Sequence, residues 1–598
     1  MPRPQRSKSR KRAPEQSPPT ISKTPQPRWL PIAVVVLSAL CLLGLFSTEV
    51  SDTDFWWHLK TGQYVIDHRA LPVPDPFAYT TAMNPPLYPG EEQVRHFNLT
   101  HEWLSQILIY CVYWIGGLPA IILARAALLA GLCALVGLLV IERTQKFYAG
   151  IAAAFATASV ATVVTVDRPM IVTFLFVAAF ITLLEFRRAL WALPVLAWIW
   201  ANSHGGFFMG WVVLLIYCVG TIPIAARWSF LNTRPMKPAD RRRLWLITAA
   251  SIAVSALNPN GLAIIPILFR YRQSAMTASL IEWHRPYLWG SPYTFDLLLY
   301  AAALVLILSW RKVWLTDWLL FAAFAAAALL AFRNVLLIGL LAPILIAAYF
   351  PYRLEVPRIA AWAVPPLLIA MVATGVARGW FFQLRTDLWK FPAGAADYLL
   401  ANHVPGPLFN TYEHGGYLIW RLWPQYRVFI DGRALSEATY KDYWQILTNP
   451  GSAEDQVTGP RADLLNRYGI RTVVMNTFQY NTGEAYSLAA ALANPANSDW
   501  QLVYDDAQSL IFRNHPPPGT PVFADRARHV LEHMETECSS NIEHSPLAYN
   551  CARTLANFWL RAGNAVRARR MLQLYVDHAI YRDPHAESIL RQLGGAPR

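Results

Sequence analysis

Long apolar runs alternate with short polar loops over the first two thirds of the chain. The clearest runs, which approach or reach the roughly 20 residues that a helix needs to cross a bilayer, are 29–46, 118–141, 207–226 and 335–350. Only helices satisfy their own backbone hydrogen bonds in lipid, so residues 29–378 are predicted to form a polytopic membrane domain. The stretches 190–201 and 244–257 are short for spans, and 262–292 is predicted to be re-entrant or interfacial.

The polar loops between these runs predict how the chain crosses the membrane. Residues 1–28 are rich in Pro, Ser, Lys and Arg, which is typical of a disordered tail attracted to anionic lipid. If this tail is cytoplasmic and 101–117 is an interfacial helix, the basic loops all fall inside, as the positive-inside rule requires. These loops hold Arg143 and Lys146, Arg187 and Arg188, the run from Arg227 to Arg243, Arg311 and Lys312, and Arg353 and Arg358. The sequence thus predicts about 11 spans in the cell (inner) membrane, with everything beyond 378 outside.

Composition narrows the class of protein. Of 598 residues, 55% are hydrophobic and 15% charged, which is too apolar for an ordinary soluble enzyme. The net charge of +14 first indicates a nucleic-acid partner. Since that charge lies in the tail and the short loops, we expect membrane lipids as partners and no nucleic acid.

Polar residues that are unusual for a membrane domain gather on the predicted outer face. The first apolar run is followed by Asp52-Thr53-Asp54, an aromatic cluster and a long outer loop at 48–117. The other polar residues predicted to approach this face are His58, His101, Glu102, Asp167, Arg168, His204, Asn258, Glu282, His284 and Arg333. Charges near lipid are costly and usually functional, so the set predicts one external site. Each residue taken singly fits a helix cap or an interfacial anchor as well.

These residue types fit sugar chemistry. Aromatic rings beside carboxylates bind the apolar faces and the hydroxyls of a sugar. A carboxylate at the membrane surface can act as a general base on an acceptor hydroxyl, and Arg168 or Arg333 can hold a phosphate leaving group. We predict His58, His101, Glu102, Arg168, His204, Glu282 and Arg333 as substrate-binding residues. Asp52 and Asp54 also have the spacing of a metal-binding pair, so a divalent metal is left open.

Three features combine in this sequence: an acidic pair after the first helix, a long outer loop with interfacial helices, and a later aspartate, Asp167. In this combination the chain resembles the GT-C superfamily. These are polytopic glycosyltransferases that use polyprenyl-phosphate sugars, and they include the protein O-mannosyltransferase, aminoarabinose-transferase and RgtA-like branches. Segments 202–207 and 258–261 resemble uncharacterised bacterial membrane proteins grouped near that superfamily. The resemblance covers residues 29–380 or so. It implies inverting transfer from a lipid-phosphate sugar to an unknown acceptor on the outer face.

The resemblance also implies which residues are catalytic. Asp54 or Asp52 would activate the acceptor, with Asp54 preferred for its place nearer the aromatic cluster, and Asp167 would be the later carboxylate of the site. Oligosaccharyltransferase members add a divalent metal, whereas several relatives manage without one.

Beyond residue 378 the composition becomes that of a soluble domain. Short apolar runs predict strands at 407–411, 427–430, 471–475, 501–504 and 509–513, mixed with helices at 393–402, 437–447 and 461–468. This alternation predicts an external α/β domain at 379–525. The tail at 526–598 resembles a tetratricopeptide helix pair, and in an oxidising compartment its Cys538 and Cys551 are candidates for a disulfide.

Two segments of the external domain are more distinctive than the rest. Asn410 to Tyr417 and Phe429 to Arg433 fit turns at strand ends, an interpretation that we favour over an acceptor-binding lid. The lid would place Glu413, His414, Asp431 and Arg433 over the membrane site.

Two other functions stay open from the sequence. A transporter or flippase of envelope precursors would need ionisable groups in mid-membrane and often internal symmetry, whereas the main such group here is Arg125 and no repeat is obvious. A non-catalytic assembly protein would use the external domain and tail to bind envelope partners.

Overall fold

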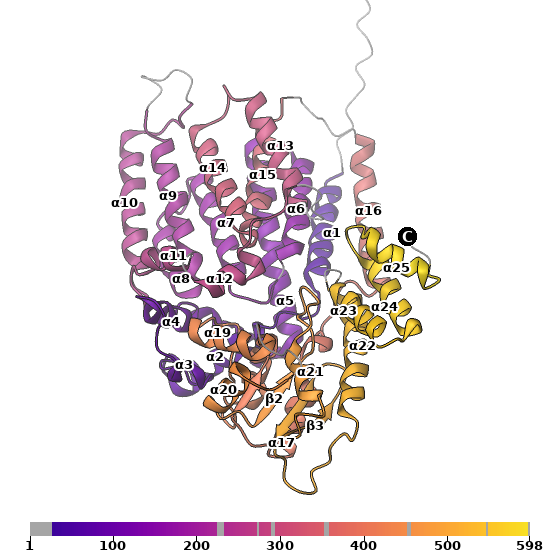
Figure 1. Ribbon diagram of the computed structural model, residues 1–598. Helices are drawn as coiled ribbons and strands as arrows, with labels where there is room; N and C mark the ends of the chain where they lie inside the picture. Colours follow the sequence, from indigo (N-terminus) through magenta and orange to yellow (C-terminus); the bar gives the residue numbers. More distant parts are fainter. Residues whose placement is uncertain are drawn as a thin grey trace, which may run out of the picture.

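The computed structural model describes residues 27–164, 166–223, 232–271, 274–288, 294–351, 358–450, 456–545 and 548–595. The predicted tail up to residue 26, residues 224–231 of the basic run, and Arg353 lie outside the described residues. The chain forms a long helical bundle, an α/β part at one end of it and a helical tail beside that part (Figure 1).

The bundle and the outer loop are helical. Their helices are α1 (Trp29–Phe46), α2 (Phe55–His68), α3 (Thr80–Met83), α4 (Glu91–Thr100), α5 (Trp103–Thr144), α6 (Phe147–Ala161), α7 (Met170–Phe186), α8 (Ala192–Ser203), α9 (Phe208–Gly220), α10 (Pro238–Ser255), α11 (Ile264–Tyr271), α12 (Ala275–Ser279), α13 (Phe295–Leu308), α14 (Leu315–Leu330), α15 (Leu336–Tyr349) and α16 (Arg358–Ala377). Among the described residues, three helical stretches are long and apolar enough to cross a membrane: Trp29–Phe46, Glu91–Thr144 and Phe332–Tyr349. Six shorter apolar helices pack with them. A polytopic membrane domain follows, and the count of about 11 spans stays a prediction.

Helix α5 is two helices joined at a sharp break. Gly116 (φ −152°, ψ 22°) and Gly117 (φ 61°, ψ −150°) leave the helical region, and Pro119 begins the next turn. The positive φ of Gly117 suits glycine, which lacks the Cβ that penalises this conformation. The break separates an outer-loop helix, 103–115, from the apolar run that follows it.

The end of the bundle remote from the α/β part is fastened by paired charges. Arg143 lies 2.9 Å from Glu185 and 3.0 Å from Asp317, and Arg234 lies 2.6 Å and 3.1 Å from the same two carboxylates. Two arginines thus balance two buried acids across α5, α7, α14 and the segment before α10. Buried charges are tolerated when paired in this way.

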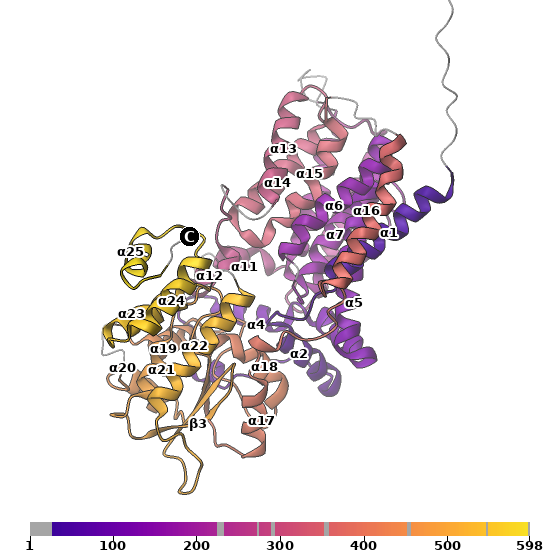
Figure 2. The same cartoon turned by 90° about the vertical axis from the view of Figure 1, so that its right-hand side faces the viewer.

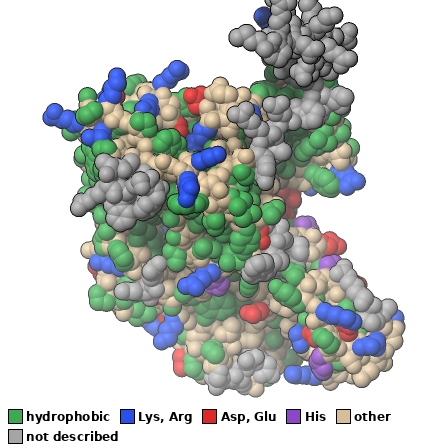
Figure 3. Space-filling model, turned by 90° about the horizontal axis from the view of Figure 1, so that it is seen from above, with side chains coloured by type: hydrophobic (Ala, Val, Ile, Leu, Met, Phe, Trp, Pro, Cys, Tyr) green, Lys and Arg blue, Asp and Glu red, His purple; other side chains and the backbone are tan. Residues whose placement is uncertain are grey.

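The surface at this remote end is basic. In Figure 3, which looks onto it, Lys and Arg are more prominent than Asp and Glu. The exposed basic residues of its helix connections and of the start of α10 include Arg187, Arg188, Lys237, Arg242, Arg243, Arg311 and Lys312. This bias is the one expected of a cytoplasmic side.

The α/β part contains a four-stranded sheet in the order β1-β2-β4-β3. Its elements are α17 (Ala393–Ala401), β1 (Leu408–Asn410), α18 (Tyr412–Leu422), α19 (Glu437–Thr448), α20 (Pro460–Arg467), β2 (Thr472–Met475), α21 (Ser487–Ala493), β3 (Trp500–Asp505) and β4 (Leu510–Asn514). Strands β1 and β2 are parallel and the other pairs antiparallel. The strand predicted at 427–430 is wrong: Val428 pairs only with Ala78 of the outer loop, so this segment joins the loop and not the sheet.

The α/β part is joined tightly to the end of α1. The Val50 N–H donates to the Arg385 carbonyl (3.0 Å), and the Asp387 N–H donates back to Val50 (2.9 Å). The Trp56 ring of α2 packs edge-on against Phe391 and Tyr417. The outer loop and the α/β part therefore share one core directly beside the acidic pair.

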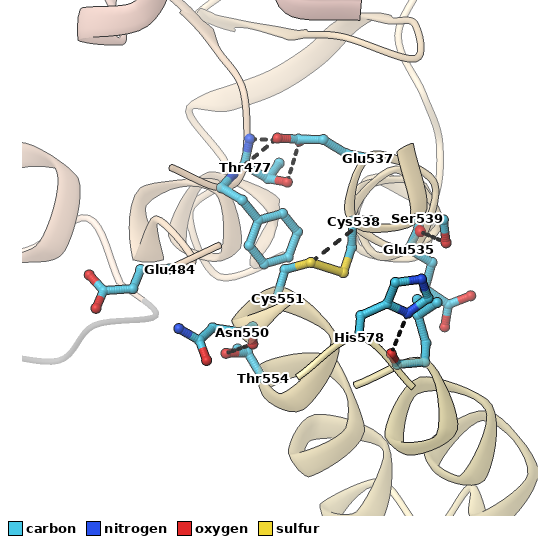
Figure 4. The surroundings of a disulfide bond; sticks show 12 residues. Thr477, Glu484, Glu535, Glu537, Cys538, Ser539, Asn550, Cys551, Thr554 and His578 are labelled. Carbon is cyan, nitrogen blue, oxygen red and sulfur yellow. Dashed lines mark hydrogen bonds between the residues drawn. A yellow bond between two sulfur atoms is a disulfide. The ribbon is translucent and has the colours of Figure 1, made fainter. Parts of the chain in front are cut away.

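Four helices form the tail, which lies beside the α/β part (Figure 2): α22 (Arg526–His544), α23 (Asn550–Arg561), α24 (Ala565–His578) and α25 (Pro584–Gln592). A disulfide between Cys538 and Cys551 joins α22 to α23 (Figure 4). The Glu537 carboxylate accepts hydrogen bonds from the backbone of Thr477 (2.8 Å) and Phe478 (3.2 Å), which docks the tail on the α/β part.

Candidate functional site

One arginine lies at the centre of the predicted external site. Arg168 precedes α7, in the connection between α6 and α7, and its guanidinium points at the segment between α1 and α2. Its Nε lies 2.6 Å from Asp52 Oδ2, and its Nη1 lies 3.0 Å from Asp54 Oδ2. The same Nη1 lies 3.4 Å from Glu282 Oε2. One cation thus joins the acidic pair to Glu282, a carboxylate more than 200 residues away in sequence.

The two aspartates of the pair have different environments. Burial raises the pKa of Asp52, but Arg168 outweighs burial and the pKa lies below its usual value. Burial, helped by the negative charge of Asp52, raises the pKa of Asp54 to about 6 against the opposing charge of Arg168. The Asp52 side chain is 5% exposed and also accepts from the Asp54 N–H, whereas Asp54 is 14% exposed. Asp52 is therefore the anchored member and Asp54 the more accessible one.

Glu282 connects the centre to a second arginine. Its Oε1 lies 3.2 Å from Arg333 Nη1, and the Arg333 guanidinium stacks on the Trp283 ring at 4.7 Å. The Phe332 N–H donates to the His284 carbonyl (2.8 Å), which ties the two segments together. Stacking and ion pairing hold Arg333 in place beside the cluster.

Asp167 lies behind the cluster and is paired with a residue inside the bundle. Its Oδ1 lies 2.6 Å from Arg125 Nη1 of α5, and both side chains are buried. Arg125 also donates to the Phe46 carbonyl (3.2 Å) and to Thr48 Oγ1 (3.0 Å). The pair therefore fixes both the end of α1 and the connection that carries Arg168. Asp167 does not contact Asp52 or Asp54 directly.

A third group of predicted residues surrounds Glu102. Its carboxylate lies 3.3 Å from His101 Nε2 and 3.6 Å from both His58 Nδ1 and His204 Nε2. Burial raises the pKa of Glu102, but the neighbouring histidines, His101 first, outweigh burial and hold it well below the usual range. Burial lowers the pKa of His58 to about 4 and that of His204 to about 3, so both are neutral at pH 7.

The Glu102 group joins outer loop and bundle. His58 belongs to α2, His101 precedes α5, and His204 lies in the turn between α8 and α9. The Gly206 N–H donates to His204 Nδ1 (3.0 Å), so the other ring nitrogen carries the proton that faces Glu102. The three histidine rings surround the Glu102 carboxylate, and most of the group is buried. The arrangement therefore suits a structural role, in which it holds the outer loop against the bundle beside the site.

Two glycines of the α/β part, Gly416 and Gly432, lie directly against the acidic pair and cover the site; we call this backbone the roof. A Cβ placed on Gly432 would lie 1.8 Å from Asp54 Oδ1, and one on Gly416 would lie 2.4 Å from the Thr53 carbonyl. Real Cβ contacts are never this close, so these two positions need glycine to let the α/β part press on the acidic pair.

This contact gives a direct prediction. Gly432→Ala is expected to open the roof, because overpacking costs about 1–3 kcal/mol, equivalent to roughly tenfold or faster local opening. Hydrogen-exchange mass spectrometry should show faster exchange in residues 52–58 and 429–433. Gly131→Ala is the matched control, because its Cβ would meet nothing within 4 Å. Unchanged exchange in Gly432→Ala would show that the roof does not rest on Asp54.

The residues considered for an acceptor-binding lid are engaged elsewhere. Arg433 is buried between Asp431 (2.7 Å) and Asp75 of the outer loop (2.6 Å). Glu413 accepts a hydrogen bond from Tyr486 (2.8 Å), and the buried His414 ring faces the Tyr480 hydroxyl. These side chains hold the α/β part together and onto the outer loop.

The residues that were candidates for a metal do not fit one. Asp52 accepts a hydrogen bond from Arg168 Nε, and Asp54 Oδ2 lies 3.0 Å from Arg168 Nη1 in an ion pair, so both carboxylates face the guanidinium. Within the described ranges, no group of three or more His, Cys, Asp or Glu is arranged to hold a metal ion.

Comparison with known proteins identifies the fold. No family model matches the chain, and no curated protein matches it by sequence. Among solved structures, the chain is similar to the archaeal oligosaccharyltransferase AglB from Archaeoglobus fulgidus, in complex with an inhibitory peptide and a dolichol-phosphate. The TM-score is 0.50, with 12% identity, over 95% of this chain and 87% of that one. At this identity the likeness shows the fold alone, which the chain shares with the AglB structure.

Proposed function

We propose that the protein transfers a sugar from a polyprenyl-phosphate-linked donor to an acceptor on the outer face of the membrane. The observation that carries this proposal is the Arg168 cluster, in which the two aspartates and a glutamate meet a cation where bundle and α/β part join. The AglB fold supports the class, since the AglB structure holds a dolichol-phosphate and a peptide. The sugar and the acceptor are left unspecified.

In the proposed reaction Asp54 is the general base. The acceptor hydroxyl attacks the anomeric carbon as Asp54 takes its proton. The bond between that carbon and the phosphate oxygen breaks, and its electron pair leaves with the polyprenyl phosphate. Arg168 and Arg333 are placed to bind the phosphate as its charge develops, through charge-assisted hydrogen bonds.

Asp54 suits the base better than its neighbours. Its pKa of about 6, raised by burial, leaves it ionised yet basic near neutral pH. Asp52 is held by Arg168 and by a backbone N–H, and Asp167 is buried against Arg125. Asp52 and Asp167 are accordingly assigned to positioning Arg168.

The pKa of Asp54 predicts an acid limit for activity. A base works only when deprotonated, so transfer should be constant well above pH 6 and fall about tenfold per unit below it. The measurement is the initial rate of transfer from pH 4.5 to 8 in a constant ionic medium. A rate that does not change from pH 7 down to pH 5 would contradict the assignment of Asp54.

The proposal is tested by donor consumption. Purified protein in lipid nanodiscs would be incubated with a panel of polyprenyl-phosphate sugars carrying a radiolabelled sugar, together with membrane extract as acceptor source. We expect label to leave the lipid fraction with at least one donor. If a donor instead crosses liposome bilayers chemically unchanged, the protein is a flippase. The protein is an assembly protein if the donors are neither consumed nor moved and if the phenotype that it confers on cells is lost on deletion of residues 540–598 but unchanged on substitution of the acidic residues.

A further inference from the structure

The charges at the centre of the site have the arrangement of a cation and its carboxylate ligands, but the cation belongs to the chain. Arg168 contacts Asp52 through Nε and both Asp54 and Glu282 through Nη1. Three acidic side chains, two from the segment after α1 and one from the segment before α13, would repel one another strongly if this charge were absent. Arginine stays protonated at any physiological pH, so the positive charge is permanent.

We propose that the Arg168 guanidinium does here the work of a divalent cation. It holds the three carboxylates together and presents its remaining nitrogen, Nη2, to a phosphate oxygen of the donor. The second part rests on the proposed function, whereas the first part stands on the ion pairs alone.

The direction of the guanidinium supports both parts. Within the described part of the chain no group accepts a hydrogen bond from Nη2, and the Arg168 side chain is 29% exposed, the most open of the arginines in the buried pairs around it. The contacts to carboxylates use Nε and Nη1, on either side of Nη2, so the Nη2 hydrogens are left for a phosphate oxygen. In this proposal Arg168 joins the three carboxylates to the donor phosphate, as a metal ion joins protein carboxylates to a phosphate.

The chain also holds Arg168 where a bound cation would otherwise be needed. The preceding residue, Asp167, is clamped by Arg125 at 2.6 Å, and Arg125 is itself fixed to the end of α1. Arg168 thus approaches the acidic pair from an anchored backbone. A divalent ion at about 2.0–2.6 Å from the same oxygens would have to displace the guanidinium or lie against its positive charge.

Removal of the guanidinium should convert the cluster into a metal site. The experiment measures Mn²⁺ binding by the loss of the free Mn²⁺ EPR signal, on purified full-length protein in detergent. The proteins compared are the wild type, Asp52→Asn, Arg168→Ala, Arg168→Lys and Arg168→Ala combined with Asp52→Asn. The matched control is Arg285→Ala, because Arg285 is exposed and lies in the segment just after Glu282.

We expect Arg168→Ala to bind Mn²⁺ at least roughly tenfold more tightly than the wild type, and the added Asp52→Asn to reverse this gain. Arg168→Lys, which keeps a positive charge, and Arg285→Ala should behave as the wild type. Two results would overturn the proposal: tight Mn²⁺ binding by the wild type that is lost on Asp52→Asn, or no gain in a folded Arg168→Ala. If Arg168→Ala does not fold, the wild-type titration and the Lys variant still decide.

The phosphate contact is tested separately. Binding of farnesyl phosphate to wild-type protein, followed by isothermal titration calorimetry, should weaken at least roughly tenfold in Arg168→Lys, which loses the planar fork. Equal affinity in the two proteins would overturn the Nη2 contact. Mn²⁺ binding needs no enzymatic activity, so a failure of the proposed transfer reaction would leave the cation result standing.

Discussion

Asp54→Asn is expected to lower the rate of sugar transfer by roughly 10²- to 10⁴-fold, the usual contribution of a positioned general base. The substitution keeps the shape of the side chain and its place beside Arg168, at 3.0 Å in the wild type, but removes the basic oxygen. Donor binding should change little, because Arg168 and Arg333, which we propose bind the phosphate, are untouched. The measurement is the initial rate of label transfer at saturating donor.

Two further variants make this result specific. Asp67→Asn is the matched control, because Asp67 is an exposed residue of the same helix and should leave the rate unchanged. Asp52→Asn should also slow transfer, through looser positioning of Arg168, and should weaken donor binding as well. If Asp52→Asn abolishes transfer and Asp54→Asn does not, the two aspartates exchange roles. Wild-type rates in both variants would remove the acidic pair from the chemistry.

Arg125→Met is expected to destabilise the protein by about 3–5 kcal/mol, the cost of leaving one partner of a buried ion pair without the other. Asp167 would remain buried with its ion-pair partner gone, and the end of α1 would lose the hydrogen bonds that Arg125 donates. The measurement is thermal unfolding of the full-length protein in detergent.

A double variant separates the ion pair from general damage to the bundle. Arg125→Met with Asp167→Asn should recover part of the lost stability, because the neutral amide avoids an isolated buried charge. Arg285→Met, at an exposed position, should unfold as the wild type. Equal loss in the single and double variants would show that Arg125 stabilises the bundle by packing alone.

Loop charge and apolar periodicity predicted much of the site. Placing each polar loop by the positive-inside rule brought Asp52, Asp54, Arg168, Glu282 and Arg333 to one face, and the structure joins all five through ion pairs. This worked because helix direction alone decides at which end of a bundle a loop lies.

Pairing within the site could not be read from the sequence. Asp167 was expected beside the acidic pair, but it turns inward to Arg125, whose position inside an apolar run was the available signal of a buried partner. Gly432 gave no signal at all, since its role depends on a contact with Asp54 across more than 300 residues of chain. Long-range contacts of this kind are set by packing and leave no local pattern.

The same reason explains the errors in the α/β part. The run at 427–430 has the β-branched and aromatic residues that strands favour, yet it pairs with the outer loop at Ala78 and lies outside the sheet. Arg433, which the less favoured lid interpretation placed over the membrane site, is instead paired with Asp431 and Asp75. Local pattern predicts the element, while the partner depends on tertiary packing.

The central claim is that the Arg168 cluster binds the phosphate of a lipid-linked donor beside Asp54. The most direct measurement is an experimental structure of the full-length protein with a non-hydrolysable polyprenyl-phosphate analogue. The account predicts the phosphate within hydrogen-bonding distance of Arg168 and Arg333, with the anomeric position facing Asp54. A phosphate bound at the opposite, basic end of the bundle would contradict it.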